Sequence, residues 1–487
     1  MNKSLRHAMG AIFYPRAIAV AGASEVPSSF GYHFIRHLLD YGYQGHIYPV
    51  NPNKEVILGL KAYQSLGSIT GHVDYVICCL PASKVVDMLY ECRAKEVKVV
   101  HLLAAGLSET GRQEGRELEA EILRTARRFG IRLVGPNCLG IYHPKGGMAS
   151  TYSLPQKPGP IGAVFQSGGA SQLLVRSGEL RGLCFSKVIS YGNALDLGES
   201  DFLDYLAEDE ETEVVASYFE GIKDGQKFLG ALTNAARAKP LIAIKGGQGM
   251  AGAKAAASHT AAIAGSEVIW RTAFKKAGVT MVRDLDEMVD CLVAFSLLSR
   301  IMGNKAGILT TAGGGLCVMA ADVCESAGLN VPPLPSDIRN TLKARAPGIW
   351  DWIGNPVDAS LIVAGASSAF FDLSREMASI LSRSPAFDFV LVELTDDNPF
   401  SDEEWAEIAS AQTEALIGLH RENLKPLAVV VSGGTFGAHV SQYERWDMLS
   451  AQRARLVEAG VPTFSSMADA ALAIRRYISY CSLSATE

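Results

Sequence analysis

The stretch Ala17–Ser24 reads AIAVAGAS and places five small apolar residues directly before a Gly-Ala-Ser turn. A continuous apolar run that ends at glycine predicts a strand buried on both faces of a parallel sheet. The following residues, Phe30–Tyr41, have the apolar spacing of a helix. A strand, a small-residue turn and a helix make up the unit that repeats in doubly wound α/β folds. This segment therefore predicts the fold class.

The same alternation of apolar runs and helical stretches continues along the chain and restarts twice, after the proline-rich stretch Pro155–Pro160 and near Gly303–Lys305. Proline does not fit inside a central strand, so the first of these stretches is expected to be a junction. We expect three doubly wound α/β domains, over residues 1–150, 151–302 and 303–487. The predicted strands are Ala17–Ala21, His46–Val50, Tyr75–Leu80, Val97–Leu103 and Leu133–Val134, then Ile161–Phe165, Cys184–Ile189, Val214–Tyr218, Pro240–Ile244 and Thr280–Val282, then Gly307–Thr311, Phe387–Leu394, Leu427–Ser432 and Pro462–Phe464.

Composition excludes several classes of protein. The 487 residues carry a formal net charge of −6 and no sustained basic run, which argues against a nucleic-acid binder. No apolar run reaches the roughly 18 residues that a membrane-spanning helix needs, and no export signal is visible. The nine cysteines form no CxxC pair and no metal-ligand spacing with histidine. We therefore expect reduced thiols, a cytoplasmic location and no metal site.

The turn after the first predicted strand has the small residues of a phosphate-binding loop. Gly22 and Ser24 lie where backbone N–H groups and a helix N-terminus can approach an anion. The second predicted strand ends at Val50 and is followed by Asn51 and Lys54, with no carboxylate to hold a ribose hydroxyl. That pattern disfavours NAD and favours a nucleotide with an extra phosphate, such as coenzyme A or NADP. A turn without a ligand is the alternative for this loop.

Two further strands lead into glycine-rich turns and helices, at Gln166–Ser171 and at Ala312–Gly315. Each turn has the composition of an anion-binding helix start, and each can equally serve close packing between helix and sheet. Three such turns in one chain favour an enzyme that handles several phosphate groups.

His259 lies in an alanine-rich segment where nearly all its neighbours are small. Imidazole is a nucleophile that can carry a phosphoryl group as a covalent intermediate. Glu220 follows a predicted strand in a Glu-Gly turn, where it can hold the second ring nitrogen of a histidine. A solvated loop histidine and a surface turn glutamate are the alternatives.

These motifs together resemble those of the α subunits of NDP-forming acyl-CoA synthetases, of the ADP-forming acetate–CoA ligase type, which are relatives of succinyl-CoA synthetase. The resemblance covers essentially the whole chain. It is carried, in family order, by Val20–Ser24 with Gly31-Tyr32, Val50–Pro52, Gly135–Gly140, Gln166–Gly169, Gly192-Asn193, Glu220-Gly221, Ala257–Thr260 and Asn355–Asp358.

The resemblance implies a Rossmann-like CoA-binding domain followed by two flavodoxin-like domains of the succinyl-CoA-synthetase type. His259 falls on the phosphohistidine, and Glu220 falls on the glutamate that hydrogen-bonds it. The implied phosphate-binding residues are Ser167, Gly168 and Gly169 at one helix start and Gly313, Gly314 and Gly315 at another. The implied CoA-binding residues are Gly22, Ser24, Asn51, Lys54, Pro81 and Asn137. The implied reaction converts a carboxylate, ATP and CoA reversibly into acyl-CoA, ADP and phosphate.

Two departures from the family pattern stand out. Ala261 follows Thr260 where the family usually has glycine, and no ATP-grasp module is present in the chain. We therefore expect ATP and Mg²⁺ to bind on a separate ATP-grasp β subunit, in an α₂β₂ assembly that acts on a small carboxylic acid.

Two other functions are compatible with parts of this pattern. One is a catalytically silent paralogue that binds CoA or acyl-CoA and regulates other proteins. The other is a nicotinamide dehydrogenase, which the missing acid after Val50 disfavours.

Overall fold

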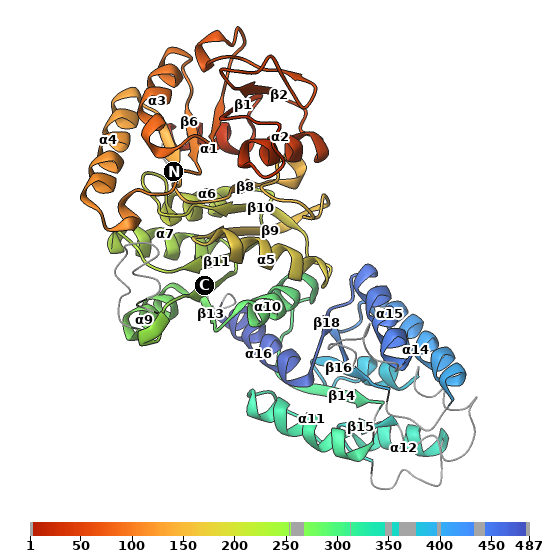
Figure 1. Ribbon diagram of the computed structural model, residues 1–487. Coiled ribbons are helices and arrows are strands. Elements are labelled where there is room, and N and C mark those ends of the chain that lie inside the picture. Colours follow the sequence, from red (N-terminus) through yellow and green to blue (C-terminus); the bar gives the residue numbers. More distant parts are fainter. Residues whose placement is uncertain are drawn as a thin grey trace. The chain divides into compact units, whose positions relative to one another are not determined.

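The computed structural model describes residues 3–252, 254, 267–311, 313–345, 353–359, 376–396, 401–432 and 444–483 (Figure 1). The chain divides into two compact units. The first comprises Met1–Glu179 and Leu183–Met288, and the second comprises Leu180–Gly182 and Val289–Glu487. Two of the main sheets lie in the first unit and one lies in the second.

The first sheet has five parallel strands in the order β2-β1-β5-β6-β7. A short hairpin of β3 (Val56–Ile57) and β4 (Leu60–Lys61) follows β2. The strands are β1 (Ala17–Ala21), β2 (His46–Val50), β5 (Tyr75–Cys78), β6 (Val99–Leu102) and β7 (Arg132–Val134), and the helices of this region are α1 (Lys3–Phe13), α2 (Phe30–Asp40), α3 (Val85–Ala94) and α4 (Gln113–Phe129).

Both faces of this sheet are buried, because alternate residues of its strands belong to different cores. Ile18 and Val20 of β1 pack in a cluster with α1 and α2. Ala19 and Ala21 pack in a second cluster, with α3 and α4. The continuous apolar run of β1 is therefore what a strand covered on both faces requires.

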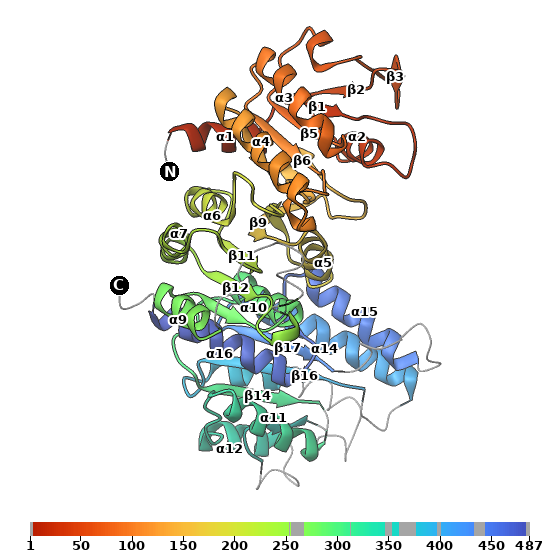
Figure 2. The ribbon, with the colours of Figure 1, turned by 60° about the vertical axis from the view of Figure 1, so that its left-hand side comes forward.

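The second sheet has the order β13-β12-β11-β9-β10-β8, with β8 antiparallel to β10 and the other pairs parallel. Helices α6 and α7 lie on one side of this sheet and α5 lies on the other (Figure 2). The strands are β8 (Gly140–Tyr142), β9 (Pro158–Phe165), β10 (Phe185–Ser190), β11 (Val214–Phe219), β12 (Leu241–Lys245) and β13 (Thr280–Val282), and the helices are α5 (Gly168–Glu179), α6 (Glu199–Glu208), α7 (Gly225–Ala238) and α9 (Glu267–Ala277). Helix α10 (Leu285–Leu297) begins in the first unit and continues into the second.

The expectation that prolines keep Pro155–Pro160 out of a central strand is wrong. β9 lies between β11 and β10, and it begins at Pro158. Pairing with both neighbours starts only at Ile161, so the prolines occupy an overhang with no ladder bond to donate. The Pro160 carbonyl still accepts a hydrogen bond from the Glu213 N–H at 2.7 Å.

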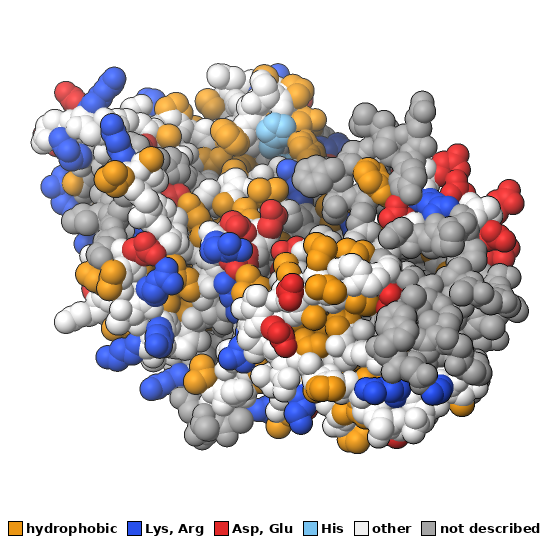
Figure 3. Space-filling model, turned by 90° about the horizontal axis from the view of Figure 1, so that it is seen from below, with side chains coloured by type: hydrophobic (Ala, Val, Ile, Leu, Met, Phe, Trp, Pro, Cys, Tyr) orange, Lys and Arg blue, Asp and Glu red, His pale blue; other side chains and the backbone are white. Residues whose placement is uncertain are grey.

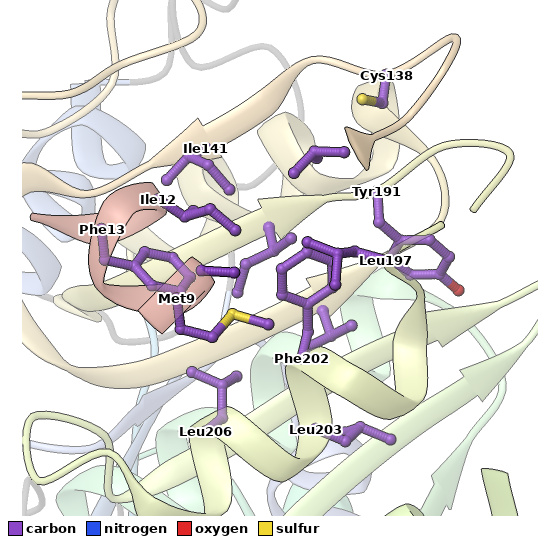
Figure 4. Close-up of a cluster of buried hydrophobic side chains, with 14 of the residues drawn as sticks. Met9, Ile12, Phe13, Cys138, Ile141, Tyr191, Leu197, Phe202, Leu203 and Leu206 are labelled. Carbon is purple, nitrogen blue, oxygen red and sulfur yellow. The ribbon is translucent and has the colours of Figure 1, made fainter. Parts of the chain in front are cut away.

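The first two sheets share one continuous core, which explains why they form a single unit. The core runs from α1, α2 and the first sheet to the strands and helices of the second. Figure 4 shows the part of it in which α1 meets α6. There, Phe13 stacks on Tyr205 with ring centroids 4.6 Å apart. The other labelled side chains are Met9, Ile12, Cys138, Ile141, Tyr191, Leu197, Phe202, Leu203 and Leu206.

The second unit holds a five-stranded parallel sheet with the order β15-β14-β16-β17-β18. Its strands are β14 (Ala306–Thr310), β15 (Val357–Asp358), β16 (Phe389–Leu394), β17 (Leu427–Val431) and β18 (Thr463–Phe464), and its helices include α11 (Gly314–Ser326), α12 (Ser336–Arg345), α14 (Asp402–Glu422), α15 (Glu444–Glu458) and α16 (Met467–Leu483).

All three sheets have the same strand order once the antiparallel β8 is set aside. In each, the first strand is internal, the second lies on one side of it, and the third, fourth and fifth follow on the other. This is the flavodoxin-like order 2-1-3-4-5, in which ligands bind beyond the carboxyl ends of the strands where the order reverses. The first strands β1, β9 and β14 lead into the three glycine-rich turns.

The predicted strands all occur, most of them within two residues of the expected bounds. Sequence reasoning missed β8, which is 3 residues long, and β3, β4 and β15, which are 2 residues long each. The expected domain boundaries near residues 150 and 302 stay predictions. Among the described residues, no helix combines the length and apolar character needed to cross a bilayer. Basic, acidic and apolar side chains are interspersed on the face shown in Figure 3.

A buried ion network fastens α1 and the loop after α6 to β10. Lys187 of β10 is fully buried, and its Nζ donates to Asp209 at 2.9 Å and to Glu211 at 2.5 Å. The ammonium also lies 5.9 Å from the Phe13 ring centroid. Burial alone would lower the pKa of Lys187, but hydrogen bonds with these two carboxylates hold it above its ordinary value. The lysine is thus kept charged.

We expect Lys187→Met to lower the free energy of unfolding of the first unit by about 3–5 kcal/mol, because two carboxylates lose their buried counter-charge. Hydrogen–deuterium exchange of peptides from β10, measured over a series of urea concentrations, gives the change in the free energy of unfolding. Lys145→Met is the matched control, since Lys145 contacts the same Glu211 at 2.5 Å but its side chain is 63% exposed. This control should cost less than about 1 kcal/mol. Equal losses in the two variants would contradict the account.

Candidate active site

A cavity of about 400 Å³ lies at the carboxyl ends of strands from both sheets of the first unit. Its apolar wall includes Phe30, Leu103 and Leu139. Its polar side chains are those of Asn137, Gln166, Ser167 and Asn193. The glycines Gly168, Gly169 and Gly192 contribute backbone to its wall. Among the described residues that line it, none is Lys, Arg or His. The lining residues thus offer an anion neutral hydrogen-bond donors only.

The start of α5 supplies backbone donors to this cavity. The first N–H groups of a helix have no intrahelical acceptor, and they carry the positive end of the helix dipole. A Cβ on Gly168 would lie 2.7 Å from the Leu139 side chain, whereas a Cβ on Gly169 would meet no atom within 4 Å. The helix start is thus packed on one side and open on the other. Ser167 Oγ accepts a hydrogen bond from the Ala170 N–H at 3.3 Å.

Two turns that bring the first and second sheets together form another wall of the cavity. The Asn193 N–H donates to the Pro136 carbonyl at 3.0 Å, and the Leu195 N–H donates to the Gly135 carbonyl at 2.9 Å. Gly192 has φ 58°, and a Cβ there would lie 2.2 Å from the Pro136 oxygen. Only glycine allows backbones to approach so closely. Asn137, a predicted CoA-binding residue, is thereby held beside the α5 start.

Glu220 is 7% exposed and lies at the end of β11, next to this cavity. Its backbone N–H donates to Gln166 Oε1 at 2.8 Å. The buried Lys245 ammonium donates to the Glu220 carbonyl at 2.9 Å, and burial lowers the pKa of this lysine. Burial, and then the charge of Glu220 and a hydrogen bond with it, raise the pKa of Tyr218 to about 12. The backbone of Glu220 is thus fixed from two sides.

The predicted CoA-binding residues gather at the carboxyl ends of β1, β2 and β5. Asn51 Nδ2 donates to the Ala23 carbonyl at 2.8 Å and so ties the loop after β2 to the loop after β1. Ser24 Oγ accepts from the Val26 N–H at 3.0 Å. Lys54 forms an exposed ion pair with Glu25 at 3.0 Å. Pro81 precedes a short 3₁₀ turn after β5.

The turn at Gly22 is shaped for close approach to the start of α2. Gly22 has φ 84°, and a Cβ on Gly31 would lie 2.1 Å from the Gly22 oxygen. The Gly22 N–H donates to the Val50 carbonyl at 3.1 Å, so it is not available to a phosphate. The remaining donors are the N–H groups at the start of α2, apart from that of Tyr32, which donates to Ser29 Oγ at 3.2 Å. A helix N-terminus, the exposed side chain of Lys54 and the absence of a carboxylate directly after β2 fit a phosphate-rich cofactor such as CoA.

The third glycine turn lies in the second unit. Gly313 caps α11, and a Cβ on Gly315 would meet no atom within 4 Å. Two acids share this edge. Asp358 Oδ2 lies 3.6 Å from the Cβ position of Gly314, and burial raises the pKa of Glu393, which accepts from Ser432 Oγ at 2.7 Å. This lining differs from the neutral one in the first unit, and phosphate binding by Gly313–Gly315 stays a prediction.

The structure brings together Asn137, the α5 start and the loop of Glu220 in one place. His259 and Ala261 lie outside the described residues. Sequence reasoning singled out Ser167–Gly169 but gave no role to Gln166 or Lys245, whose contacts across strands no local pattern reveals. The strand-end position of both residues, each directly before or at a glycine turn, was the available signal.

The geometry defines a doubly wound α/β protein with a cavity at a strand-order reversal, lined by a helix start and neutral polar side chains, next to a loop suited to a phosphorylated cofactor. Comparison with protein families agrees with it. Residues 16–144 match the model of a CoA binding domain. Residues 158–295 match the model of the succinyl-CoA ligase like flavodoxin domain.

Similar proteins narrow this class. The α subunit of acetate–CoA ligase [ADP-forming] II of Pyrococcus furiosus is 36% identical over 379 residues, which are 78% of this chain and 80% of that protein. Acetate–CoA ligase [ADP-forming] I of Archaeoglobus fulgidus is 38% identical over 80% of this chain and 55% of that protein. The chain thus belongs to the family of ADP-forming acetate–CoA ligases and corresponds to their α subunits.

A solved structure extends the similarity over the whole chain. It is the dinucleotide forming acetyl-coenzyme A synthetase 1 of Ca. Korarchaeum cryptofilum, in complex with phosphate and ADP. It has a TM-score of 0.79 and 27% identity, and the match covers 99% of this chain and 98% of that chain. The expected α/β class, with a CoA-binding domain followed by a flavodoxin-like ligase domain, is confirmed.

We predict that Gly169→Leu abolishes binding of inorganic phosphate in the first unit without destabilising the fold, because the new side chain extends into open space in front of the helix start. Replacing a helical glycine with leucine should itself stabilise by up to about 1 kcal/mol. Gly230→Leu is the control, since a Cβ on Gly230 in α7 also meets no atom within 4 Å. Isothermal titration with phosphate and thermal unfolding measure the two effects. Undiminished phosphate binding by Gly169→Leu would place the anion elsewhere.

Proposed function

We propose that this chain is the α subunit of an ADP-forming acyl-CoA synthetase that makes acyl-CoA, ADP and phosphate from a carboxylate, ATP and CoA, reversibly. The observation that carries the proposal is the cavity in which the α5 start meets Asn137, beside the loop of Glu220, whose backbone bonds to the lining residue Gln166. It combines a site for an anion with a wall from the CoA-binding domain. Family membership supports the reaction type, since the relatives are named as ADP-forming CoA ligases.

The proposed chemistry has two steps at this cavity. A carboxylate oxygen attacks the phosphorus of a phosphorylated His259, so a P–O bond forms, the P–N bond breaks and an acyl phosphate results. CoA supplies the thiol that is acylated in the second step, in which a C–S bond forms and phosphate leaves. Activation is needed because a carboxylate has no leaving group that a thiolate can displace.

The chain's own residues would stabilise and orient these species. The Ser167–Gly169 helix start would receive the phosphoryl group through backbone donors, whose dipoles need no reorganisation during the reaction. Glu220 would accept a hydrogen bond from His259 and fix its tautomer. Gly22, Ser24, Asn51, Lys54, Pro81 and Asn137 would form the CoA site.

The nucleotide side of the reaction would involve a second chain. Several relatives are named as α subunits, which supports the presence of a partner. We propose that the partner carries an ATP-grasp domain that binds ATP and Mg²⁺, that the assembly is α₂β₂, and that phosphorylated His259 moves to the Gly313–Gly315 helix start to exchange its phosphoryl group with the nucleotide. We also propose a cytoplasmic location, in keeping with nine cysteines that all lie in the described part of the chain and form no disulfide there.

His259→Ala should abolish acyl-CoA synthesis from acetate, ATP and CoA by the complex with its partner, because no other group would relay the phosphoryl. Binding of CoA to the variant should be unchanged, since the CoA-binding residues lie elsewhere. His46→Ala, at the exposed start of β2, is the control and should retain activity. Full activity of His259→Ala would exclude a phosphohistidine at this residue. If the wild-type protein binds CoA but the wild-type complex makes no acyl-CoA, the silent paralogue is favoured.

Glu220→Gln should slow phosphorylation of His259 by about 10²–10⁴-fold, because an amide no longer stabilises the imidazolium character of the ring. Rapid-quench measurement of acid-labile phosphate on the protein, starting from acetyl phosphate, gives the rate. Glu213→Gln, at the edge before β11, serves as the control. An unchanged rate in Glu220→Gln would show that Glu220 is a turn residue with no role in the phosphorylation of His259.

A further inference from the structure

The side-chain amide of Gln166 has one defined orientation. Its Oε1 accepts two hydrogen bonds, from the Glu220 N–H at 2.8 Å and from the Gly221 N–H at 3.2 Å. An NH₂ group cannot accept from a backbone N–H, so the network itself assigns oxygen and nitrogen. The Gln166 backbone N–H also donates to the Tyr218 carbonyl at 3.1 Å. Gln166 is therefore fastened to the end of β11 at three points.

This orientation leaves the NH₂ group of Gln166 for the cavity. The residue is 7% exposed and lines the cavity directly before the α5 start. Among the described residues, no acceptor is bonded to Nε2. A ligand oxygen in the cavity can therefore accept a hydrogen bond from this NH₂ group.

Asn193 is the other cavity residue whose side-chain amide has an orientation defined by its contacts, and its NH₂ group already has an acceptor. Asn193 Nδ2 donates to Glu109 Oε2 at 3.3 Å, which leaves its oxygen to the cavity. No described Lys, Arg or His lines the cavity. Negative charge that develops beside the α5 start therefore meets few side-chain donors, of which Gln166 has a fixed direction.

We propose that Gln166 Nε2 is the donor that stabilises the carbonyl oxygen of the acyl group while the thioester forms. This assignment rests on the proposed function. The helix start takes the phosphoryl group, and Gln166, immediately before it in the chain, is placed for the neighbouring carbonyl of the same acyl phosphate.

The step is an acyl transfer. The CoA sulfur forms a bond to the acyl carbon, and the carbonyl electron pair moves onto oxygen, which accepts the Nε2–H hydrogen bond. The pair then returns, the C–O bond to phosphate breaks, and the leaving phosphate takes up the proton of the thiol, so that it departs as hydrogen phosphate. Because Gln166 is fixed by backbone donors, its NH₂ group is preorganised, and such donors contribute most where charge develops.

Acetyl-CoA formation from acetyl phosphate and CoA, without nucleotide, isolates this step. We compare Gln166→Glu with Gln166→Leu. A carboxylate in Gln166→Glu still accepts from both backbone N–H groups, so the loop stays anchored, but the donor is lost. Both variants should lower kcat by about 10²–10³-fold with little change in the KM for CoA. An anchoring role alone predicts loss in Gln166→Leu and wild-type kcat in Gln166→Glu, and that result would overturn the proposal.

The pH dependence gives an independent readout. A protonated carboxyl regains an O–H donor, so the kcat of Gln166→Glu relative to wild type should rise as the pH falls. A ratio independent of pH would count against a donor role. Gln226→Glu, on the exposed first turn of α7, controls for a new charge and should be indistinguishable from wild type. If wild-type protein makes no acetyl-CoA from acetyl phosphate and CoA, the proposed function itself fails.

Discussion

The reversal of strand order at the first strand of each sheet is the constraint on which the rest of the structure depends. Because β1, β9 and β14 are internal, with the second strand on one side and the third on the other, the connections on their two sides diverge. The carboxyl end of each first strand is therefore not covered by a crossover helix. It opens onto helix N-termini, where small residues can bring backbone donors to an anion.

In the first unit, the strand order reverses in both sheets, and the loops at the carboxyl ends of the two sheets meet. The turns after β7 and β10 are bonded to each other through the backbones of Gly135, Pro136 and Asn193, so loops of the first and second sheets line the same cavity. The cavity lacks described cationic side chains, and its electrostatics depend on dipoles. Gln166 and Lys245 both bond to the backbone of the Glu220–Gly221 turn and so fix the position of this turn.

Much of this architecture is predictable from the sequence because its signals are local. Apolar runs such as Ala17–Ala21 are buried on both faces, and glycines such as Gly22 mark positive φ or close approach. The short pairings β8 and β15 have no such signal, since they depend on neighbours far away in sequence. The tolerance of Pro158 and Pro160 in β9 likewise depends on the register at which β10 and β11 begin to pair. The same holds for Gln166, whose partners lie 54 and 55 residues away.

The central claim is that the first unit alone can pass a phosphoryl group from phosphate and an acyl-CoA to His259. Incubating the purified chain with acetyl-CoA and ³²P-labelled phosphate, without nucleotide or partner, tests it most directly. The account predicts acid-labile label on His259 and release of acetate and CoA. A chain that binds CoA but takes up no label under these conditions would contradict it.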